Sequence, residues 1–456
     1  MIDFLTNALS VYHASDYIIK KLNETGGFTE LKPDEAWKLE PGHGYYVCPF
    51  GTTVIAFRTG NAAASVSMSD AACQPALYKP DIPDKLRIIA SHIDHPGFRV
   101  KENPEIKQGS YVKLNVESYG GAILNTWLDR PLGAAGCVWV RDKDGRAAKF
   151  LVDFDGPAFI IPNVAIHMNR KINEGIELNK QIDMLPLAYA SEAHTQEAHV
   201  QDDGNEKDYS FRTEIAYHIH RIHNVSVKPE DILSYDISIY NAEKPVYVGR
   251  DRELIMAGGI DNVSSEKACL DAITGIEDNQ GIIISAFFDH EEVGSRSKNG
   301  ADSSMLANII ERICISLGYD RNEYLAMVMN GEFLSLDVAH ANNPNHPEKY
   351  DPTSGVSLGS GVTIKCSSRQ NYCTDADMTA RLLELAGNNG VKCSVNYLRS
   401  DIPGGSTIGS ILSSQLPMRS ADIGIPILAM HSAMETMSVS DQRNLDRLAA
   451  AFLAQH

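Results

Sequence analysis

Short apolar runs followed by polar residues recur along this chain and predict buried strands. The run at 281–288 is partly β-branched and aromatic, and the adjacent acids Glu291 and Glu292 follow it closely. Similar runs lead into His92 and into His431. Because ligand sites in α/β proteins lie where strands end, the polar residues at these positions are candidates for a functional site.

Helix-like segments alternate with these runs in the outer parts of the chain. The apolar spacing predicts helices at 17–24, 266–276 and 443–454. Alternation of this kind favours an α/β fold, with a largely parallel or mixed central sheet flanked by helices.

A long interval separates His92 from Asp261, whereas the later polar candidates follow at shorter intervals. An inserted domain is the simplest explanation, and it contains alternating, strand-like pieces such as 111–116. A polar, acidic segment at 201–208 is expected to be an exposed loop. The predicted division is a catalytic domain at 1–99 and 248–456, interrupted by an insert at 100–247.

Two adjacent acids at a strand end are poorly explained by solubility, although an acidic surface loop is the alternative. One acid could bind a metal while the other faces a water. Four further segments offer imidazole or carboxylate groups, a combination that favours zinc. Two histidines, two aspartates and one glutamate suit a pair of divalent ions bridged by one acid. The first segment and these four together contain His92, Asp261, Glu292, Asp337 and His431.

Several blocks of the chain resemble the aspartyl aminopeptidase and vacuolar aminopeptidase I family of metallopeptidases. They extend from the first hundred residues nearly to the C-terminus. The matching blocks are SHIDHPGFRVK at 91–101, YGGAILNTWLDRPL at 119–132, IPNVAIHMNR at 161–170, GGIDNVSS at 258–265, DHEEVGS at 289–295, LDVAHANNPN at 336–345, GSTIG at 405–409 and AMHS at 429–432.

The resemblance implies a role for each candidate ligand. His92 and Asp337 would complete one metal site, Glu292 and His431 would complete the other, and Asp261 would bridge them. The ions would most simply be zinc, with cobalt or manganese as alternatives. Two more acids would be catalytic: Glu291 as the general base and proton shuttle, and Asp94 as the acid that orients a histidine ligand.

The resemblance also implies substrate contacts. His340 would contact the peptide or the tetrahedral intermediate, while Lys365 and Tyr372 would line the pocket for the first side chain. A lysine there favours acidic N-terminal residues slightly over leucine-like ones, although an edge-strand lysine is the alternative. His167 would reach a neighbouring subunit's active site, where sequence alone suggests a solvated loop histidine.

Small departures from the family leave the substrate preference open. Pro403 and Gly404 precede Gly405 where relatives often carry cysteine. Acidic, neutral and basic preferences are all compatible with the same metal centre. Two other functions also remain open: a related binuclear amidohydrolase that removes an acyl group, and a catalytically idle homo-oligomeric scaffold.

Other signals are weaker. The GVSLG string around Ser357 matches a serine-hydrolase elbow, but a strand-like piece follows it instead of a helix. The histidines at 218, 220 and 223 are interpreted as a solvated helix face. The glycines at 404–409 are interpreted as a rim near the substrate, because no Lys-Ser/Thr pair follows. His95 and His290 are interpreted as neighbours of the ligands.

Composition agrees with a soluble, cytoplasmic enzyme. The 456 residues allow two or more domains, and the formal charge of −18 argues against nucleic-acid and anionic-membrane partners. No apolar stretch of spanning length and no signal peptide are apparent. The eight cysteines are scattered and predict thiols in a reducing compartment. The resemblance implies a β-rich dimerisation insert and a tetrahedral dodecamer acting on peptides.

Overall fold

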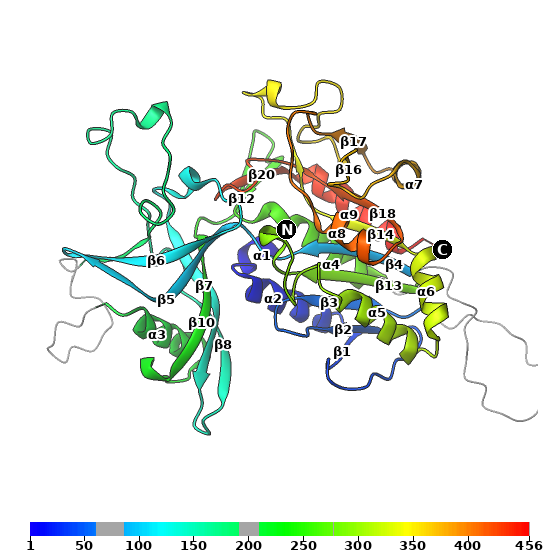
Figure 1. Ribbon diagram of the computed structural model, residues 1–456, viewed down its shortest axis with the longest axis horizontal. Coiled ribbons are helices and arrows are strands. Elements are labelled where there is room, and N and C mark those ends of the chain that lie inside the picture. Colours follow the sequence, from blue (N-terminus) through cyan, green and yellow to red (C-terminus); the bar gives the residue numbers. More distant parts are fainter. Residues whose placement is uncertain (61–85, 191–208, 277, 456) are drawn as a thin grey trace, which may run out of the picture.

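The computed structural model describes residues 1–60, 86–190, 209–276 and 278–455, and they form two bodies (Figure 1). A nine-stranded sheet flanked by helices makes the larger body, and a six-stranded sheet makes the smaller one. The α/β class with a mixed central sheet and a β-rich insertion is therefore confirmed. The acidic segment expected to form a loop at 201–208 lies outside the described residues.

The centre of the large sheet is parallel, since β13, β4, β14 and β18 all run in one direction. Antiparallel pairs β2–β3, β3–β13 and β16–β18 make the sheet mixed. Every residue of β4 and β13 is buried, which explains their nearly continuous apolar sequences. The strands, in spatial order, are β1 (Phe28–Glu30), β2 (Gly44–Val47), β3 (Val54–Arg58), β13 (Ile282–Phe288), β4 (Leu86–His92), β14 (Glu332–Leu336), β18 (Arg419–Gly424), β16 (Val362–Cys366) and β17 (Cys393–Tyr397).

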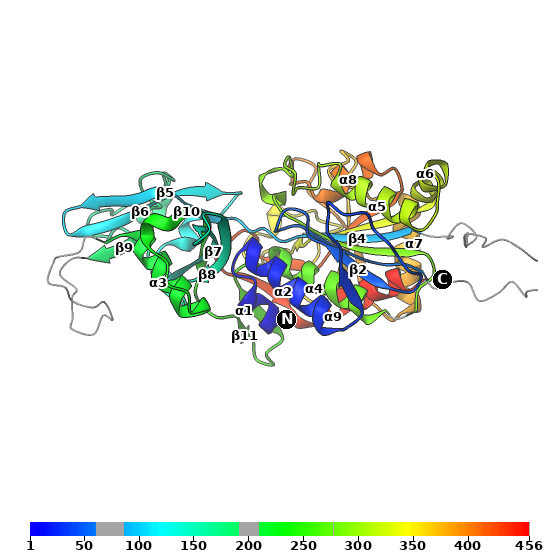
Figure 2. The same ribbon diagram turned by 90° about the horizontal axis from the view of Figure 1, so that it is seen from below.

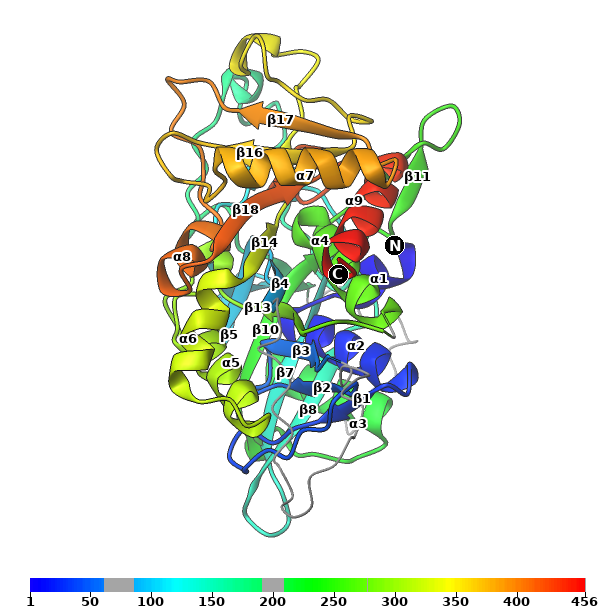
Figure 3. The ribbon, with the colours of Figure 1, turned by 90° about the vertical axis from the view of Figure 1, so that its right-hand side faces the viewer.

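Helices cover both faces of this sheet (Figures 2 and 3). The segments expected to be helical at 17–24, 266–276 and 443–454 fall largely within α2, α4 and α9. One face packs against α1 (Ile2–Asn7), α2 (Val11–Glu24), α4 (Ile260–Gly275), α7 (Ala376–Asn388) and α9 (Val439–Leu453). The other face packs against α5 (Met305–Ser316), α6 (Arg321–Asn330) and α8 (Ile408–Gln415).

The six-stranded sheet is antiparallel throughout, and α3 (Phe211–His223) packs on it. The strand-like piece at 111–116 lies in β6, as expected. The strands of this six-stranded sheet, in spatial order, are β8 (Ala147–Asp153), β7 (Leu132–Arg141), β10 (Ile232–Asn241), β5 (Gly97–Gln108), β6 (Tyr111–Tyr119) and β9 (Leu187–Ala190).

The histidines of α3 do not form the uniformly solvated face that we expected. His218 is buried, with its ring stacked on Phe154 at a centroid distance of 4.4 Å. His220 and His223 are exposed. The helix turns His218 toward the core of the insert because His218 lies on the same face as Ile215.

A third sheet packs against α4 and α9 and continues the chain beyond β14 and β18. Its strands are β11 (Val246–Val248), β12 (Leu254–Ala257), β20 (Glu435–Ser438), β19 (Pro426–Leu428) and β15 (Ala339–His340). Short 3-10 helices occupy several connections: η1 (Leu124–Trp127), η2 (Ile172–Glu174), η3 (Pro229–Asp231), η4 (Glu291–Val293) and η5 (Pro347–Lys349).

Two smaller observations bear on the sequence interpretation. The cysteines in the described part of the chain are free thiols, as expected. Among the described residues, no helix has the length and apolar character needed to cross a membrane.

Candidate metal centre

The candidate ligands meet where the central parallel strands end. His92 is the last residue of β4, and Asp337 directly follows β14. Glu291 and Glu292 lie in η4, just beyond β13, which pairs in parallel with β4. Parallel strands present their carboxyl ends at one edge, so residues far apart in sequence are brought together.

Asp261 occupies the middle of the cluster. Its Oδ1 lies 3.4 Å from Nε2 of His92, and its Oδ2 lies 3.4 Å from Nε2 of His431. Nε2 of His92 is also 3.6 Å from Oδ1 of Asp337, while Nε2 of His431 is 3.4 Å from Oε2 of Glu292. Asp261 therefore joins two groups of possible ligands.

The cluster suits divalent cations. Asp261 is 3% exposed, and its Oδ1 has no hydrogen-bond partner. Burial raises the pKa of Glu292 well above its ordinary value, and the charge of Asp261 raises it further. A buried carboxylate normally needs a compensating charge, and the mixture of imidazole and carboxylate oxygen matches zinc. In the described part of the chain, all three groups that could hold a metal draw on this cluster.

His92 and His431 compensate the charge of the buried Asp261 carboxylate. Burial lowers the pKa of His92, but the neighbouring carboxylates of Asp261 and Asp337 outweigh it and raise the pKa well above its ordinary value. Burial likewise raises the pKa of Asp261, but His431 and His92 outweigh it and lower the pKa below its ordinary value. A bound cation would take over this role from the protons on the two rings.

Asp94 holds the turn that carries both acids. Its Oδ1 accepts a hydrogen bond from the Glu291 amide and its Oδ2 accepts one from the Glu292 amide, both at 3.0 Å. The Tyr119 hydroxyl donates to Oδ2 at 2.6 Å. Nδ1 of His92 lies 3.1 Å from the Asp94 carbonyl and 3.5 Å from its carboxylate. Asp94 thus contacts the candidate ligand His92 and also holds the backbone of the acid pair.

Glu291 lies beside the candidate ligands. One of its carboxylate oxygens lies within 4.8 Å of the possible ligand atoms of His92 and Glu292. Burial raises its pKa to about 7, with opposing contributions from nearby charges. A carboxyl with a pKa near neutrality can both accept and return a proton.

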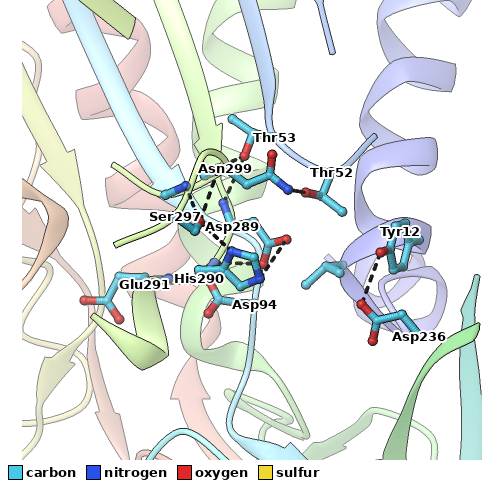
Figure 4. A network of polar contacts seen from close by, with 12 residues as sticks. Tyr12, Thr52, Thr53, Asp94, Asp236, Asp289, His290, Glu291, Ser297 and Asn299 are labelled. Carbon is cyan, nitrogen blue, oxygen red and sulfur yellow. Dashed lines mark hydrogen bonds and ion pairs between the residues drawn. The ribbon is translucent and has the colours of Figure 1, made fainter. Parts of the chain in front are cut away.

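The loop that surrounds Glu291 and Glu292, from Asp289 to Asn299, is fixed by a further set of polar contacts (Figure 4). His290 Nδ1 lies 2.7 Å from the Ser297 hydroxyl, and the His290 amide donates to Asp289 at 2.7 Å. Asn299 binds Thr52 at 2.8 Å. The Glu291 carboxylate points away from this network (Figure 4). His290 is therefore a neighbour of the acids, as expected.

His95 also lies beside the ligands. Its Nδ1 is 2.8 Å from the Asp261 carbonyl, and none of the possible metal-holding groups among the described residues includes it.

Glu435 is a supporting residue that sequence reasoning missed. Its carboxylate accepts the Asp261 amide at 3.0 Å and the His431 amide at 2.7 Å. Burial and the charge of Asp261 raise its pKa to about 8. The available signal was an acid four residues after His431, at the start of a strand whose other residues are mostly buried.

A cavity of about 600 Å³ opens on the cluster. His340, Lys365 and Tyr372 line it, and so do residues 405–407 of the glycine-containing segment at 404–409. No helix follows Ser357, so the elbow geometry is absent there, and β16 follows as expected. His167 lies exposed in the insert and does not line this cavity.

Lys365 lines the pocket and is also hydrogen-bonded to a candidate ligand. It is 3% exposed, and its ammonium donates to Oδ2 of Asp337 at 3.2 Å and to the Val338 carbonyl at 3.1 Å. The same ammonium lies 5.1 Å from the centre of the Tyr372 ring. Lys365 therefore connects the metal cluster to the pocket wall.

Comparisons with known proteins identify the family of this chain. The family model described as "Aminopeptidase I zinc metalloprotease (M18)" matches residues 4–453. A protein of Clostridium novyi called "Probable M18 family aminopeptidase 2" is 38% identical over 443 residues, covering 97% of this chain and 94% of that protein. A protein of the same name from Pseudomonas fluorescens is 33% identical over 456 residues, covering 100% of this chain and 97% of that protein.

Solved structures share the fold. Ape4, solved in complex with Nbr1, superposes with a TM-score of 0.90 and 29% identity, covering 99% of this chain and 84% of Ape4. The mApe1 of Chaetomium thermophilum gives a TM-score of 0.80 and 28% identity, covering 99% and 96%. The M18 aminopeptidase of Thermotoga maritima gives a TM-score of 0.79 at 23% identity, covering 100% and 95%, a likeness of fold.

The family match covers nearly the whole chain, and the strand ends carry the imidazoles and carboxylates that zinc binds in proteins. The chain therefore belongs to the M18 family of aminopeptidase I zinc metalloproteases, and it is an aminopeptidase of the hydrolase class.

Proposed function

We propose that this enzyme removes the N-terminal residue of short peptides, with Glu291 as the general base at a centre that binds two zinc ions. The observation that carries the proposal is the position of Glu291, whose carboxylate adjoins the ligand cluster and whose pKa is raised to about 7 by burial. Two zinc ions bound there would polarise the scissile carbonyl and activate a water. Glu291 would accept a proton from that water and return it to the departing amine.

For the ions we propose the ligand division expected from the sequence. His92 and Asp337 would hold one ion, Glu292 and His431 the other, and Asp261 would bridge them. The contacts of Asp261 with both histidines support this division, because each carboxylate oxygen faces a different ligand group. Cobalt or manganese would occupy the same oxygen and nitrogen ligands.

For the substrate we propose a slight preference for acidic N-terminal residues. An ammonium has three donor protons, and Lys365 directs two hydrogen bonds at Asp337 and Val338. The remaining proton could bind a substrate carboxylate near Tyr372. His340 would contact the peptide or the intermediate, since burial lowers its pKa and favours the neutral ring. A neutral, leucine-like preference with the same chemistry is the alternative.

For the assembly we propose a cytoplasmic homo-oligomer in which residues 100–247 form a dimerisation domain, inserted between parts 1–99 and 248–456 of the catalytic domain. The exposed apolar side chains around His167 support a covered surface: Val164 is 53% exposed, Ile166 52% and Met168 82%. An mApe1 of yeast with the same fold forms a dodecamer. In a similar dodecamer, His167 would reach the neighbouring active site.

The deciding experiment uses metal-stripped enzyme reloaded with zinc, cobalt or manganese and a panel of aminoacyl substrates (Asp, Glu, Leu, Lys and Ala). We expect metal-dependent release, fastest for Asp and Glu. Release of Leu or Lys instead would refute the acidic preference and leave the peptidase chemistry intact. A requirement for N-acylated substrates would favour the amidohydrolase alternative, and inactivity with every metal would favour the scaffold.

The Glu291→Gln variant tests the base directly. We expect it to keep zinc and the oligomer but to lose at least about 1,000-fold in kcat, within the usual range for a general base. A kcat near that of the wild type would refute the role of Glu291.

A further inference from the structure

The strand β6 of the insert ends at the wall of the metal centre. Tyr119 is its last residue, and Gly120 and Gly121 follow it. At Gly120, where φ is +67°, an added Cβ would lie 3.2 Å from Cβ of Glu292. The Gly121 carbonyl lies 3.3 Å from Nδ1 of His431. The insert therefore touches the turn that carries Glu291 and Glu292 and also a candidate ligand, and a side chain at Gly120 would be strained by the positive φ and crowded by Glu292.

Tyr119 reaches the turn that carries Glu291 and Glu292 through Asp94. Its hydroxyl donates to Oδ2 of Asp94, the same oxygen that accepts the Glu292 amide. Asp94 is fully buried, so water could not readily replace a lost donor. Burial and the charge of Asp94 raise the pKa of Tyr119, so the hydroxyl remains a donor across the working pH range.

Arg99 holds the Tyr119 ring in place from β5. Its guanidinium lies 4.2 Å from the centre of that ring. NH1 of the same guanidinium lies 3.2 and 3.1 Å from the two carboxylate oxygens of Asp236, in β10. The Tyr12 hydroxyl, from α2, also donates to Asp236 at 3.1 Å (Figure 4). The base of the insert and a helix of the larger body are thereby joined to Asp94.

We infer that Tyr119 is a positioning residue for the reaction, through which the insert fixes the orientation of Glu291 by way of Asp94. The Tyr119 hydroxyl orients the Asp94 carboxylate, and that carboxylate holds the amides of Glu291 and Glu292. Arg99 and Asp236 in turn restrain the Tyr119 ring. The inference rests on the proposed role of Glu291 as base.

Tyr119→Phe removes the hydroxyl and keeps the ring under Arg99. Kinetics are measured at saturating zinc on the best substrate of the panel, together with zinc content, oligomeric state and thermal midpoint. We expect kcat to fall about 10- to 100-fold, the usual effect of a partner that orients a ligand or base. KM should stay within about twofold, because the substrate-contacting residues are unchanged.

Tyr240→Phe is the matched control. Tyr240 also lies in the insert and donates to an aspartate, but that aspartate is Asp153, at 2.9 Å, instead of Asp94. We expect its kcat to stay within twofold of the wild type. A Tyr119→Phe enzyme with normal kcat, or with a loss that follows its zinc loss, would overturn the inference.

Arg99→Met tests the next contact in the series, the one between Arg99 and the Tyr119 ring. If Arg99 acts through Tyr119, the Tyr119→Phe/Arg99→Met double variant should be no slower than Tyr119→Phe alone, within about twofold. Losses that multiply would overturn this order of contacts. Glu291→Gln separates the two proposals: if it stays active, the base assignment fails, whereas an inactive Glu291→Gln beside a normal Tyr119→Phe refutes only the positioning role.

Discussion

The ammonium group of Lys365 lies 3.2 Å from Oδ2 of Asp337, so a residue expected to select the substrate is bonded to a candidate metal ligand. Both side chains are largely buried. Removing either partner of a buried ion pair leaves the other charge without compensation. Burial raises the pKa of Asp337, but the charge of Lys365 and the neighbouring His92 together lower it below its ordinary value. Lys365 therefore acts on the cluster as well as on the pocket.

Lys365→Met should lower kcat/KM for both Asp and Leu substrates by about 10-fold or more, with the larger loss on Asp. The shared part arises because Asp337 loses its buried partner, and the extra part arises because the pocket loses its cation. Parallel kinetics on the two substrates measure both parts. A loss confined to Asp substrates would show that Lys365 acts on selectivity alone.

The rate should depend on pH through Glu291. The carboxylate form is the base, and a pKa raised to about 7 leaves about half of it protonated at neutral pH. We expect kcat/KM to rise between pH 5 and pH 8, and bound cations would move this limb to lower pH because they favour the ionised form. A profile that is flat from pH 5 to pH 8 would contradict this assignment.

Glu435→Gln should weaken zinc binding by about 10- to 100-fold. The substitution replaces one accepting oxygen by an amide donor, so either the Asp261 or the His431 amide loses its partner. Competition with a zinc chelator measures the affinity. Glu230→Gln, an exposed position in the insert, is the control and should bind zinc like the wild type.

Buried His218 should make the protein less stable in mild acid. Burial lowers its pKa to about 4, so the folded chain excludes a proton that the unfolded chain binds. Stability is complete above the ordinary histidine pKa of about 6.5 and is lost as pH falls toward 4.

The His218→Phe variant tests this directly. Between pH 7 and pH 5, its thermal midpoint should fall less than that of the wild type, by about 3 °C. The exposed His220→Gln control should behave like the wild type. Equal falls in wild type and His218→Phe would show that His218 does not contribute.

The sequence could bring the candidate ligands together because they end or shortly follow apolar runs, and the ends of parallel strands lie at one edge of a sheet. His92 and Asp337 illustrate this rule. Glu435 and Tyr119 could not be predicted in the same way, because they act through backbone amides and a carboxylate supplied by distant segments. Their sequence neighbourhoods contain no spacing that identifies such contacts.

Side-chain direction was the other source of error. His218 was expected to be solvated because it stands among His220 and His223, but helical geometry turns it toward Phe154. Lys365 meets Asp337 because β14 and β16 both pair with β18. These strands are not adjacent in sequence. Local pattern predicts elements, whereas these contacts depend on the order of strands in the sheet.

The separation of His92 from Asp261 and His431 along the chain has a consequence for biosynthesis. The ribosome releases His92 long before the segment with His431, and the parallel pairing of β4 with β13 must wait for the whole insert to be made. The proposed hydrolytic centre can therefore assemble only after the segment with His431 has been made. A nascent peptidase is in this way kept from cleaving peptides until the insert and His431 have both been synthesised.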